Sequence, residues 1–471
     1  MVYSDGFQNI ITYRGSVDVP FRVRLTDGYE VDFSPVVQHA YFSRLSGVGQ
    51  LDIIDRVITG AKHTRYEHSL GVFYLAQEFI RGRRHNLTPY EQFLLLSVSL
   101  LHDIGHGPNS HVYDIVAKDY GFPDHKEMGL KIIEEMEEDL KKAAGANFKH
   151  NRVVDDITDT LKNKTPLAKL VASKGVSFDR LDYIFRDTYY CGGDGASVKE
   201  QLRTIMDNLY FDGKNIAVDA QHTHDITLFI QAIVHNNIKI YIREDIEKLE
   251  AFLMRAMAYS IESGDLDIMK EYSGVDSSLD AVLRSNAKSR SIMEALGRPF
   301  NPSYKWVTAA SIRHKEAESV VQSDPRIEMT GQGIVGYPAK IPELVYIEEE
   351  ADIDELGKKV KLPKLVKFEK RIIRDLKLRP TELATTFSPQ IDRLLLDDSY
   401  VVHTENGRPV FESILDIDTG LRNSIEVYMK RLHAVRLITT EEKVDKVKSY
   451  VRRHDKTGKG GLRNILVAAL D

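Results

Sequence analysis

Apolar residues recur at helical spacing through most of the first 262 residues. Between Leu70 and Ile80 they follow the period of an amphipathic helix, which predicts a helix over residues 64–81. Thr88 followed by Pro89 predicts the start of the next helix, because threonine caps a helix and proline suits its first turn. The sequence FLLLSVSLLHD that follows is apolar on every side, as expected of a helix in the middle of a bundle.

This pattern divides the chain into three parts. β-Forming residues alternate over residues 8–33 around Asp27-Gly28, so residues 1–34 are expected to form an N-terminal β segment. Residues 35–262 are expected to form one mostly α-helical domain. From residue 263 the elements are shorter and mixed, and YVVHTENGRPVFESI is typical of a β-hairpin around Asn406-Gly407. We therefore predict a mainly α fold whose smaller α+β lobe, residues 263–471, ends in a basic tail from residue 441.

The composition is that of an ordinary globular chain. Hydrophobic residues at 42% and charged residues at 28% argue against wholesale disorder and against a membrane protein. The net charge of −6 argues against a chain that is basic overall, although it permits a local basic patch. Cys191 is the single cysteine, which excludes an intrachain disulfide and favours a reducing, cytoplasmic setting. The N-terminus lacks the features of a signal peptide and no apolar run approaches a membrane span, so no membrane partner is expected.

Histidine is concentrated near the start of the helical region, where residues 63–125 hold seven of the chain's 16 histidines. His68 falls on the first predicted helix, one turn after Arg65, and His102 and Asp103 are adjacent at the end of the apolar helix. Burying such groups is costly unless each has a partner, and one divalent cation satisfies them together. A mixed set of imidazole and carboxylate ligands favours Fe, Zn, Mn or Ni over calcium.

A fourth ligand is expected from the segment FDRLDYIFRDTYY, whose helix Ser177 can cap. At about 100° per residue, one sector of this helix holds Asp179, Tyr183, Arg186 and Asp187. Asp179 is the candidate for the remaining ligand. A metal with open positions can activate water and polarise a phosphoryl oxygen, so this ligand set predicts hydrolysis of a phosphate ester or anhydride.

Each of these residues also has a purely structural interpretation. A histidine–aspartate dipeptide alone is common, and core histidines with helix-capping aspartates are the alternative to a metal site. Arginine binds phosphate bidentately, which makes Arg65 and Arg180 candidate phosphate contacts, whereas a surface ion pair is expected for Arg186. A histidine oriented by a carboxylate can serve as acid or base near neutral pH. The candidates for such a proton-transfer group are His111, Asp114 and His125.

Three segments carry a family resemblance: GQLDIIDRVITGAKHTRYEHSLGV, LLHDIGHGPNSHVYD and FDRLDYIFRD. They closely resemble the deoxynucleoside triphosphate (dNTP) triphosphohydrolases of the HD superfamily, especially the catalytic domain of the SAM- and HD-domain-containing dNTPase and its bacterial relatives. The resemblance covers roughly residues 20–262. It implies cleavage of a dNTP at the α-phosphorus into a deoxynucleoside and intact triphosphate. It also implies a homo-oligomer, a dimer or tetramer, controlled by allosteric nucleotides, with additional Mg²⁺ on the nucleotide phosphates as an option.

The resemblance assigns the catalytic centre residue by residue. The implied metal ligands are His68, His102, Asp103 and Asp179. Arg65 would bind the phosphates, and His106 would lie near the α-phosphate and the ester oxygen. The implied proton-transfer group is again His111, Asp114 and His125.

The same resemblance assigns the walls of a substrate pocket. The residues implied around the sugar 3′-hydroxyl, where a tight wall would exclude a 2′-hydroxyl, are Gln50, Leu51 and Asp187. Arg180 and Tyr183 would meet the phosphates and the sugar. Tyr241 would stack near the base.

Two positions depart from the family pattern. Lys126 follows His125 where a relative has glutamate, so Glu127 would have to support that histidine. The helix before Tyr241, FIQAIVHNNIKIY, lacks the arginine that relatives direct at the terminal phosphate, unless Arg243 reaches it. The resemblance is therefore weakest for the length of the phosphate chain and for base preference.

Two alternatives to a dNTP triphosphohydrolase stay open. One is an HD phosphodiesterase or nucleotidase that acts on another nucleotide. The other is a nucleotide- or nucleic-acid-binding regulator, which the basic tail favours. Asp445 and Asp455 interleave that tail, however, as is typical of a solvated helix with a loop.

Overall fold

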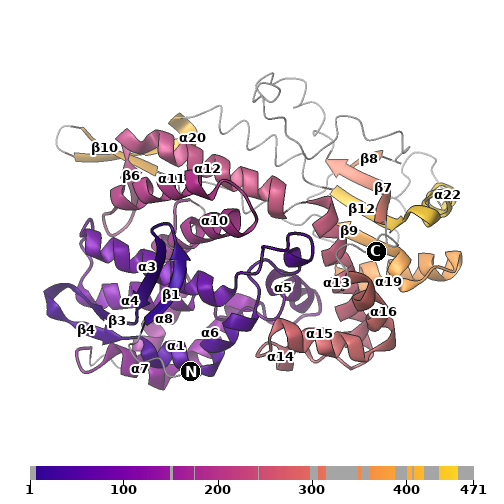
Figure 1. The fold of residues 1–471 in the computed structure, drawn as a ribbon, viewed down its shortest axis with the longest axis horizontal. Helices are drawn as coiled ribbons and strands as arrows, with labels where there is room; N and C mark the ends of the chain where they lie inside the picture. Colours follow the sequence, from indigo (N-terminus) through magenta and orange to yellow (C-terminus); the bar gives the residue numbers. More distant parts are fainter. Residues whose placement is uncertain are drawn as a thin grey trace.

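The predicted mainly α fold is confirmed by the computed structural model (Figure 1). The structure describes residues 7–148, 152–173, 175–241, 243–297, 306–314, 348–351, 361–387, 400–405, 408–417 and 434–454. The helices up to residue 262 are α1 Ser34–Gln38, α2 Ala40–Ser43, α3 Arg65–Gly82, α4 Pro89–Leu101, α5 Ser110–Asp119, α6 His125–Glu135, α7 Glu137–Ala144, α8 Val153–Leu161, α9 Leu167–Val171, α10 Phe178–Tyr190, α11 Gly195–Asn208, α12 Thr223–Asn236 and α13 Glu244–Glu262. The later helices are α14 Ile268–Glu271, α15 Asp276–Ser285, α16 Ala287–Leu296, α19 Leu362–Leu376, α20 Ile414–Ile417 and α22 Val444–His454.

Two antiparallel strand pairs precede the helices, and they confirm the predicted N-terminal strands. Strand β1 (Phe7–Thr12) pairs with β2 (Gly15–Pro20), and β3 (Arg22–Arg24) pairs with β4 (Glu30–Asp32). Apolar residues of this segment join the main hydrophobic core. The β segment therefore covers part of the helical domain.

Helix α4 runs through the centre of the helical domain. It begins at a capping box in which Thr88 and Glu91 exchange side-chain-to-backbone hydrogen bonds, and every residue from Gln92 to Leu101 is buried. Helix α3 begins at a second capping box, formed by Thr64 and Glu67, and packs against both α4 and α10. The two predicted helix starts are confirmed. Apart from Gln92, Ser97 and Ser99, this buried stretch of α4 is apolar, so charged side chains reach its environment only from its ends and from its neighbours.

A mixed four-stranded sheet joins distant parts of the chain. Its order is β11 (Arg408–Ser413), β10 (Tyr400–Glu405), β6 (Ile216–Asp219) and β5 (Leu209–Phe211), with β10 parallel to β6. The predicted hairpin of β10 and β11 is confirmed, although its turn residues Asn406-Gly407 lie outside the described residues. The sequence does not predict β5 and β6, because strands of three and four residues show too little alternation to be distinguished from helix ends. In Figure 1, β10 lies beside β6, across the molecule from β9 and β12.

A second mixed sheet supports the predicted α+β character of the C-terminal part. Its order is β8 (Glu348–Ala351), β7 (Trp306–His314), β12 (Ala434–Thr440) and β9 (Leu383–Phe387). The sequence of residues 331–355, GQGIVGYPAKIPELVYIEEEADIDE, predicts strands and turns followed by an acidic stretch, and of these only β8 lies within the described residues. The predicted basic tail is described as far as His454, by a short 3₁₀ turn and α22. Among the described residues, no helix is long and apolar enough to cross a membrane.

A second hydrophobic core binds the helical domain to the chain that follows it. It contains buried residues of α5, α13, α15 and α16, together with Tyr272 just after α14, whose ring meets that of Tyr113 on α5 edge to face at 5.0 Å. Arg255 of α13 forms a buried ion pair with Glu369 of α19. The apolar face of α5 therefore packs against later helices, chiefly α13, whereas its first turn faces the rest of the helical domain.

Candidate metal centre

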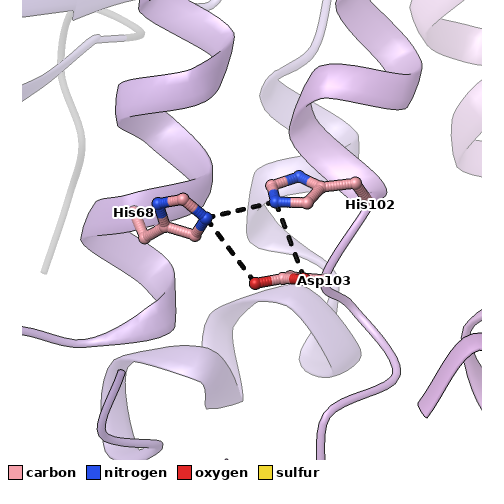
Figure 2. Close-up of side chains that lie close together, drawn as sticks. All are labelled: His68, His102 and Asp103. Carbon is pink, nitrogen blue, oxygen red and sulfur yellow. Dashed lines mark hydrogen bonds and ion pairs between the residues drawn. The ribbon is translucent and has the colours of Figure 1, made fainter. Parts of the chain in front are cut away.

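The first three expected metal ligands lie together where α3 meets the end of α4 (Figure 2). His68 comes from α3, His102 ends α4, and Asp103 follows it. Their ligand atoms all lie within 4.8 Å of one another. The His68 Nε2 atom lies 3.2 Å from His102 Nε2 and 3.6 Å from Asp103 Oδ2. This cluster is a possible site for a divalent metal.

Asp179, the expected fourth ligand, reaches the same point from the first turn of α10. Its Oδ1 atom lies 3.2 Å from His68 Nε2 and 3.9 Å from His102 Nε2. Helix α10 begins at Ser177, whose side chain accepts a hydrogen bond from Arg180 N, as expected. Asp179 is more exposed than the other three candidates, so it lies on the solvent side of the cluster.

The hydrogen bonds behind the two histidines test whether a metal fits. His68 Nδ1 lies 2.8 Å from Asp182 Oδ2, and His102 Nδ1 lies 3.0 Å from the Ser99 carbonyl oxygen. Both partners only accept hydrogen bonds, so in each neutral ring Nδ1 carries the proton and Nε2 presents a lone pair. Two lone pairs and two carboxylates then converge, and these four groups offer one another no donor. A divalent cation fits such a set.

The electrostatics of the cluster favour positive charge at this point. Burial lowers the pKa of His68, but hydrogen bonds to Asp179 and Asp182 outweigh burial and raise this pKa to about 10. Without a metal the His68 ring is therefore protonated, and a metal would take the place of its Nε2 proton. Burial raises the pKa of Asp103, but the charges of His102 and Arg65 outweigh it and hold this pKa well below the usual range. Asp103 thus stays ionised and favours positive charge beside it.

Arg65 links the metal cluster to the turn that carries the other histidines. The side chain is buried, and its guanidinium donates to Asp103, to Ser110 Oγ at 2.7 Å and to His111 Nε2 at 3.3 Å. The expected contact of Arg65 with substrate phosphates stays a prediction. In this structure its guanidinium also fixes Asp103 relative to the first turn of α5.

The expected proton-transfer residues gather on the other side of Asp103. His106 Nε2 lies 3.5 Å from Asp103 Oδ1, and its ring stacks on that of His125 with centroids 4.0 Å apart. His125 Nδ1 lies 2.9 Å from Asp114 Oδ2, so the carboxylate orients His125 rather than His111. Burial, Arg65 and His125 lower the pKa of His106 well below the usual value, which keeps this ring neutral.

The residues expected around the sugar and the base lie on α10, on the segment that ends at Tyr241, and on the loop before α3. The carboxylate of Asp187 accepts from the Tyr241 hydroxyl and lies 2.7 Å from His63 Nε2. Gln50 is buried with its Oε1 atom unpaired among the described residues, and Leu51 packs in a small apolar cluster that Tyr241 contacts. The structure therefore brings Asp187 and Tyr241 together. It gives the Tyr241 hydroxyl a carboxylate partner, whereas stacking of this ring on a base stays a prediction.

The remaining candidates have different surroundings. Arg180 is buried, and the ring of Tyr183 meets that of Tyr241 at 6.5 Å. The surface ion pair expected for Arg186 is wrong, because Arg186 is fully buried in an ion pair with Asp182.

The two departures from the family pattern also have structural partners. Glu127 belongs to the capping box of α6 with Asp124, so this carboxylate supports the helix start that carries His125 rather than its ring. Arg243 pairs with Asp245 at 2.6 Å. The terminal-phosphate contact therefore stays without a candidate from the residues singled out in the sequence.

The sequence analysis missed several residues that hold the site. Asp182 supports His68, His63 supports Asp187, and Asp52 accepts from His111 N at 2.6 Å. For Asp182 a signal existed, because it lies three residues after Asp179 and therefore on the same side of the helix. For His63 and Asp52 the contacts depend on loop conformation, which has no periodic pattern.

Comparison with known proteins identifies the domain that carries this cluster. Residues 65–173 match the family model described as the HD domain. The chain contains an HD domain. The matched range includes His68, His102, Asp103 and the turn after α4 that carries the other histidines, whereas Asp179 lies beyond it.

Three relatives show how far the likeness extends. An uncharacterised protein of Methanocaldococcus jannaschii is 26% identical over 58% of this chain and 58% of its own length. A protein of Dictyostelium discoideum, named as a homologue of the deoxynucleoside triphosphate triphosphohydrolase SAMHD1, is 28% identical over 40% of this chain and 39% of its own length. A solved Bacteroides thetaiotaomicron structure, described as a phosphohydrolase, shares the fold with a TM-score of 0.62 at 18% identity, covering 92% of this chain and all of that one. The matches thus cover just over half of the Methanocaldococcus protein and about two fifths of the Dictyostelium protein.

Proposed function

We propose that this protein is a metal-dependent phosphohydrolase that cleaves dNTPs into deoxynucleosides and triphosphate. The observation that carries the phosphohydrolase proposal is the convergence of His68, His102, Asp103 and Asp179 within an HD domain. The choice of dNTPs is supported by the partial match to the SAMHD1 homologue. One divalent metal, Fe, Zn, Mn or Ni, fits the mixed ligand set.

In the proposed reaction, water attacks the α-phosphorus and the bond from this phosphorus to the 5′-oxygen breaks. The oxygen of water ends in the triphosphate, and the 5′-oxygen leaves as the hydroxyl of the deoxynucleoside. A metal held by the four ligands would supply Lewis-acid catalysis. Asp182 and the Ser99 carbonyl hold both imidazoles in the tautomer that this metal needs.

The proton for the leaving oxygen is assigned to the histidine stack. His125 is oriented by Asp114, and a histidine with a carboxylate partner can hold and donate a proton near neutral pH. The neutral ring of His106 lies between His125 and Asp103, which supports a role for it beside the reacting phosphate. Arg65 keeps Asp103 ionised and in place.

Discrimination for deoxyribose is assigned to the wall around Gln50. The Oε1 atom of Gln50, buried and without a hydrogen-bond partner among the described residues, can accept a hydrogen bond from a sugar hydroxyl, and an unsatisfied buried acceptor of this kind selects for a ligand donor. Asp187 is held rigidly by His63 and Tyr241 on the same wall.

Product analysis in ¹⁸O-labelled water tests the proposal. Purified protein is incubated with each dNTP and with Mn²⁺ or Mg²⁺, and we expect deoxynucleoside and triphosphate that carries one ¹⁸O. Release of only pyrophosphate or orthophosphate would contradict the proposed cleavage. Asp103→Ala is the control, since it removes a metal ligand and should release neither product. Matched ribonucleotides should react more slowly.

A second candidate is hydrolysis of another nucleotide by the same centre. The ion pair of Arg243 with Asp245 favours this candidate. Arg243 is the residue proposed from the sequence to contact the terminal phosphate, and Asp245 already binds it. A panel of nucleoside monophosphates, cyclic nucleotides and ribonucleotides separates the two. Faster turnover of a monophosphate or cyclic nucleotide than of every dNTP would favour the second candidate.

A further inference from the structure

The segment Gly274–Asp276 contacts both loops that border the metal centre. It lies just before and at the start of α15, outside the matched HD domain. Asp276 Oδ2 accepts from Gly49 N at 2.8 Å, and Asp276 Oδ1 accepts from Asn109 N at 2.7 Å. One carboxylate therefore joins the loop that carries Gln50 to the turn that leads into His111.

Two neighbouring contacts strengthen this connection. Arg44 donates from Nη2 to the carbonyls of Ile104 and His106, both at 2.8 Å, and from Nη1 to Gly274 O at 3.4 Å. Val275 packs so closely on Gly47 that a Cβ atom at Gly47 would lie 2.8 Å from Val275 Cγ1. The whole segment is thus seated on the two loops.

The turn that Asp276 holds is strained. Asn109 and Ser110 have φ angles of 52° and 44°, in the left-handed region that costs non-glycine residues free energy. Such a conformation persists when the surroundings fix it. Here Asp276 binds Asn109 N, Ser110 Oγ donates to Gly49 O at 2.6 Å, and Asp52 binds His111 N.

We propose that Asp276 is a positioning residue that sets the register between the Gln50 loop and the His111 turn. Its carboxylate connects the helices after residue 262 with the catalytic histidines, although it touches neither metal nor substrate. The effect on rate rests on the proposed phosphohydrolase function, whereas the effect on loop structure does not. Burial raises the pKa of Asp276 to about 6, in keeping with a carboxyl group removed from water.

Asp276→Asn tests the proposal. The amide keeps one acceptor and turns an N–H donor toward either Gly49 N or Asn109 N, so one connection is lost. We expect amide hydrogen exchange to accelerate at Gly49, Asn109 and also His111, whose N–H does not bind Asp276. We also expect kcat to fall by roughly 10- to 100-fold, as catalytic misplacement by about 1 Å can cause. KM and metal content should change little.

Asp280→Asn is the matched control on the same helix. Asp280 binds Arg56, six residues after Gln50, at 3.1 Å and Arg284 at 2.9 Å, so this variant also weakens the docking of α15 but removes no hydrogen bond to Gly49 or Asn109. It should leave exchange at His111 and kcat unchanged. If Asp280→Asn had the same effect as Asp276→Asn, Asp276 would act only in docking and the proposal would be wrong.

Gly47→Ala gives a second perturbation that changes no charge. Its methyl group should push Val275 away, because it would meet both Cγ1 and Cβ of that residue, and reproduce the faster exchange at His111. The double variant with Val275→Gly, which removes both of these atoms, should restore slow exchange. Unchanged exchange at His111 in both Asp276→Asn and Gly47→Ala would overturn the proposal. So would unchanged kcat in an active Asp276→Asn protein. If the wild type cleaved no nucleotide, the proposed function would fail, and the exchange at His111 would still decide the role of Asp276.

Discussion

Replacing Asp182 with asparagine should weaken metal binding without removing any ligand. Asp182 Oδ2 lies 2.8 Å from both His68 Nδ1 and Arg186 Nε, and Oδ1 lies 2.8 Å from Arg186 Nη2. An asparagine has one acceptor oxygen for these three donors. If its oxygen faces His68, its NH₂ opposes Arg186; if its NH₂ faces His68, the imidazole proton must move to Nε2, where it blocks the metal.

The magnitude of each effect follows from the burial of the three groups. Loss of a carboxylate behind a metal-bound histidine typically weakens metal affinity about 10- to 100-fold, which corresponds to about 1.4–2.8 kcal/mol. The Arg186 guanidinium is completely buried and would lose its charged partner, which costs about 3–5 kcal/mol of folding free energy. Asp182→Asn should therefore lower both the metal affinity and the free energy of unfolding.

A second variant separates the two effects. In Asp182→Asn/Arg186→Gln the buried cation is gone, so much of the stability should return while the metal affinity stays low. Metal titration followed by elemental analysis, together with urea unfolding of the metal-free protein, measures both quantities. Asp156→Asn is the control, because Asp156 on α8 accepts a hydrogen bond from Tyr90 and contacts no candidate ligand. Wild-type metal affinity in Asp182→Asn would refute the argument.

Three further changes test the other parts of the site. His102→Ala should abolish both bound metal and activity, as measured by elemental analysis and product release; retention of both would defeat the ligand assignment. His125→Gln should keep the metal and lower kcat by roughly 10²–10⁴-fold, the usual contribution of a proton-transfer group; an unchanged rate would exclude this role. Burial raises the pKa of Asp114, but the hydrogen bond and charge of His125 outweigh it and lower this pKa below its usual value. The pair therefore stabilises the protein above about pH 4 and loses this effect as the pH falls, so the difference in unfolding free energy between wild type and Asp114→Asn should be largest near neutral pH and shrink below pH 4.

The parts of the fold that the sequence predicts well are those with long periodic patterns. Helices α3 and α4 each begin at a capping box and are largely buried, and their predicted starts agree with the structure. The candidate ligands His68, His102 and Asp103 could be recognised from the sequence for the same reason, because polar residues on or at the end of a buried helix need a partner. Strands β5 and β6 could not be predicted, since they have only three and four residues and β10, which extends their sheet beside β6, follows about 180 residues later.

Helix α10 shows why the interior of a site is harder to predict than its ligands. Periodicity correctly places Asp179, Arg186 and Asp187 on one side of the helix, yet it does not distinguish the charge that meets a metal from the charge that meets another side chain. The structure makes this distinction through neighbours on α3: His68 takes Asp179 on its Nε2 side and Asp182 on its Nδ1 side. Gly71 permits the second contact, because a Cβ atom there would lie 1.9 Å from Asp182 Oδ1. Gly71 on α3 and Asp182 on α10 therefore act together to fix the His68 tautomer. Gly71→Ala should accordingly reproduce the weaker metal binding of Asp182→Asn, although it leaves every ligand and every charged residue in the sequence.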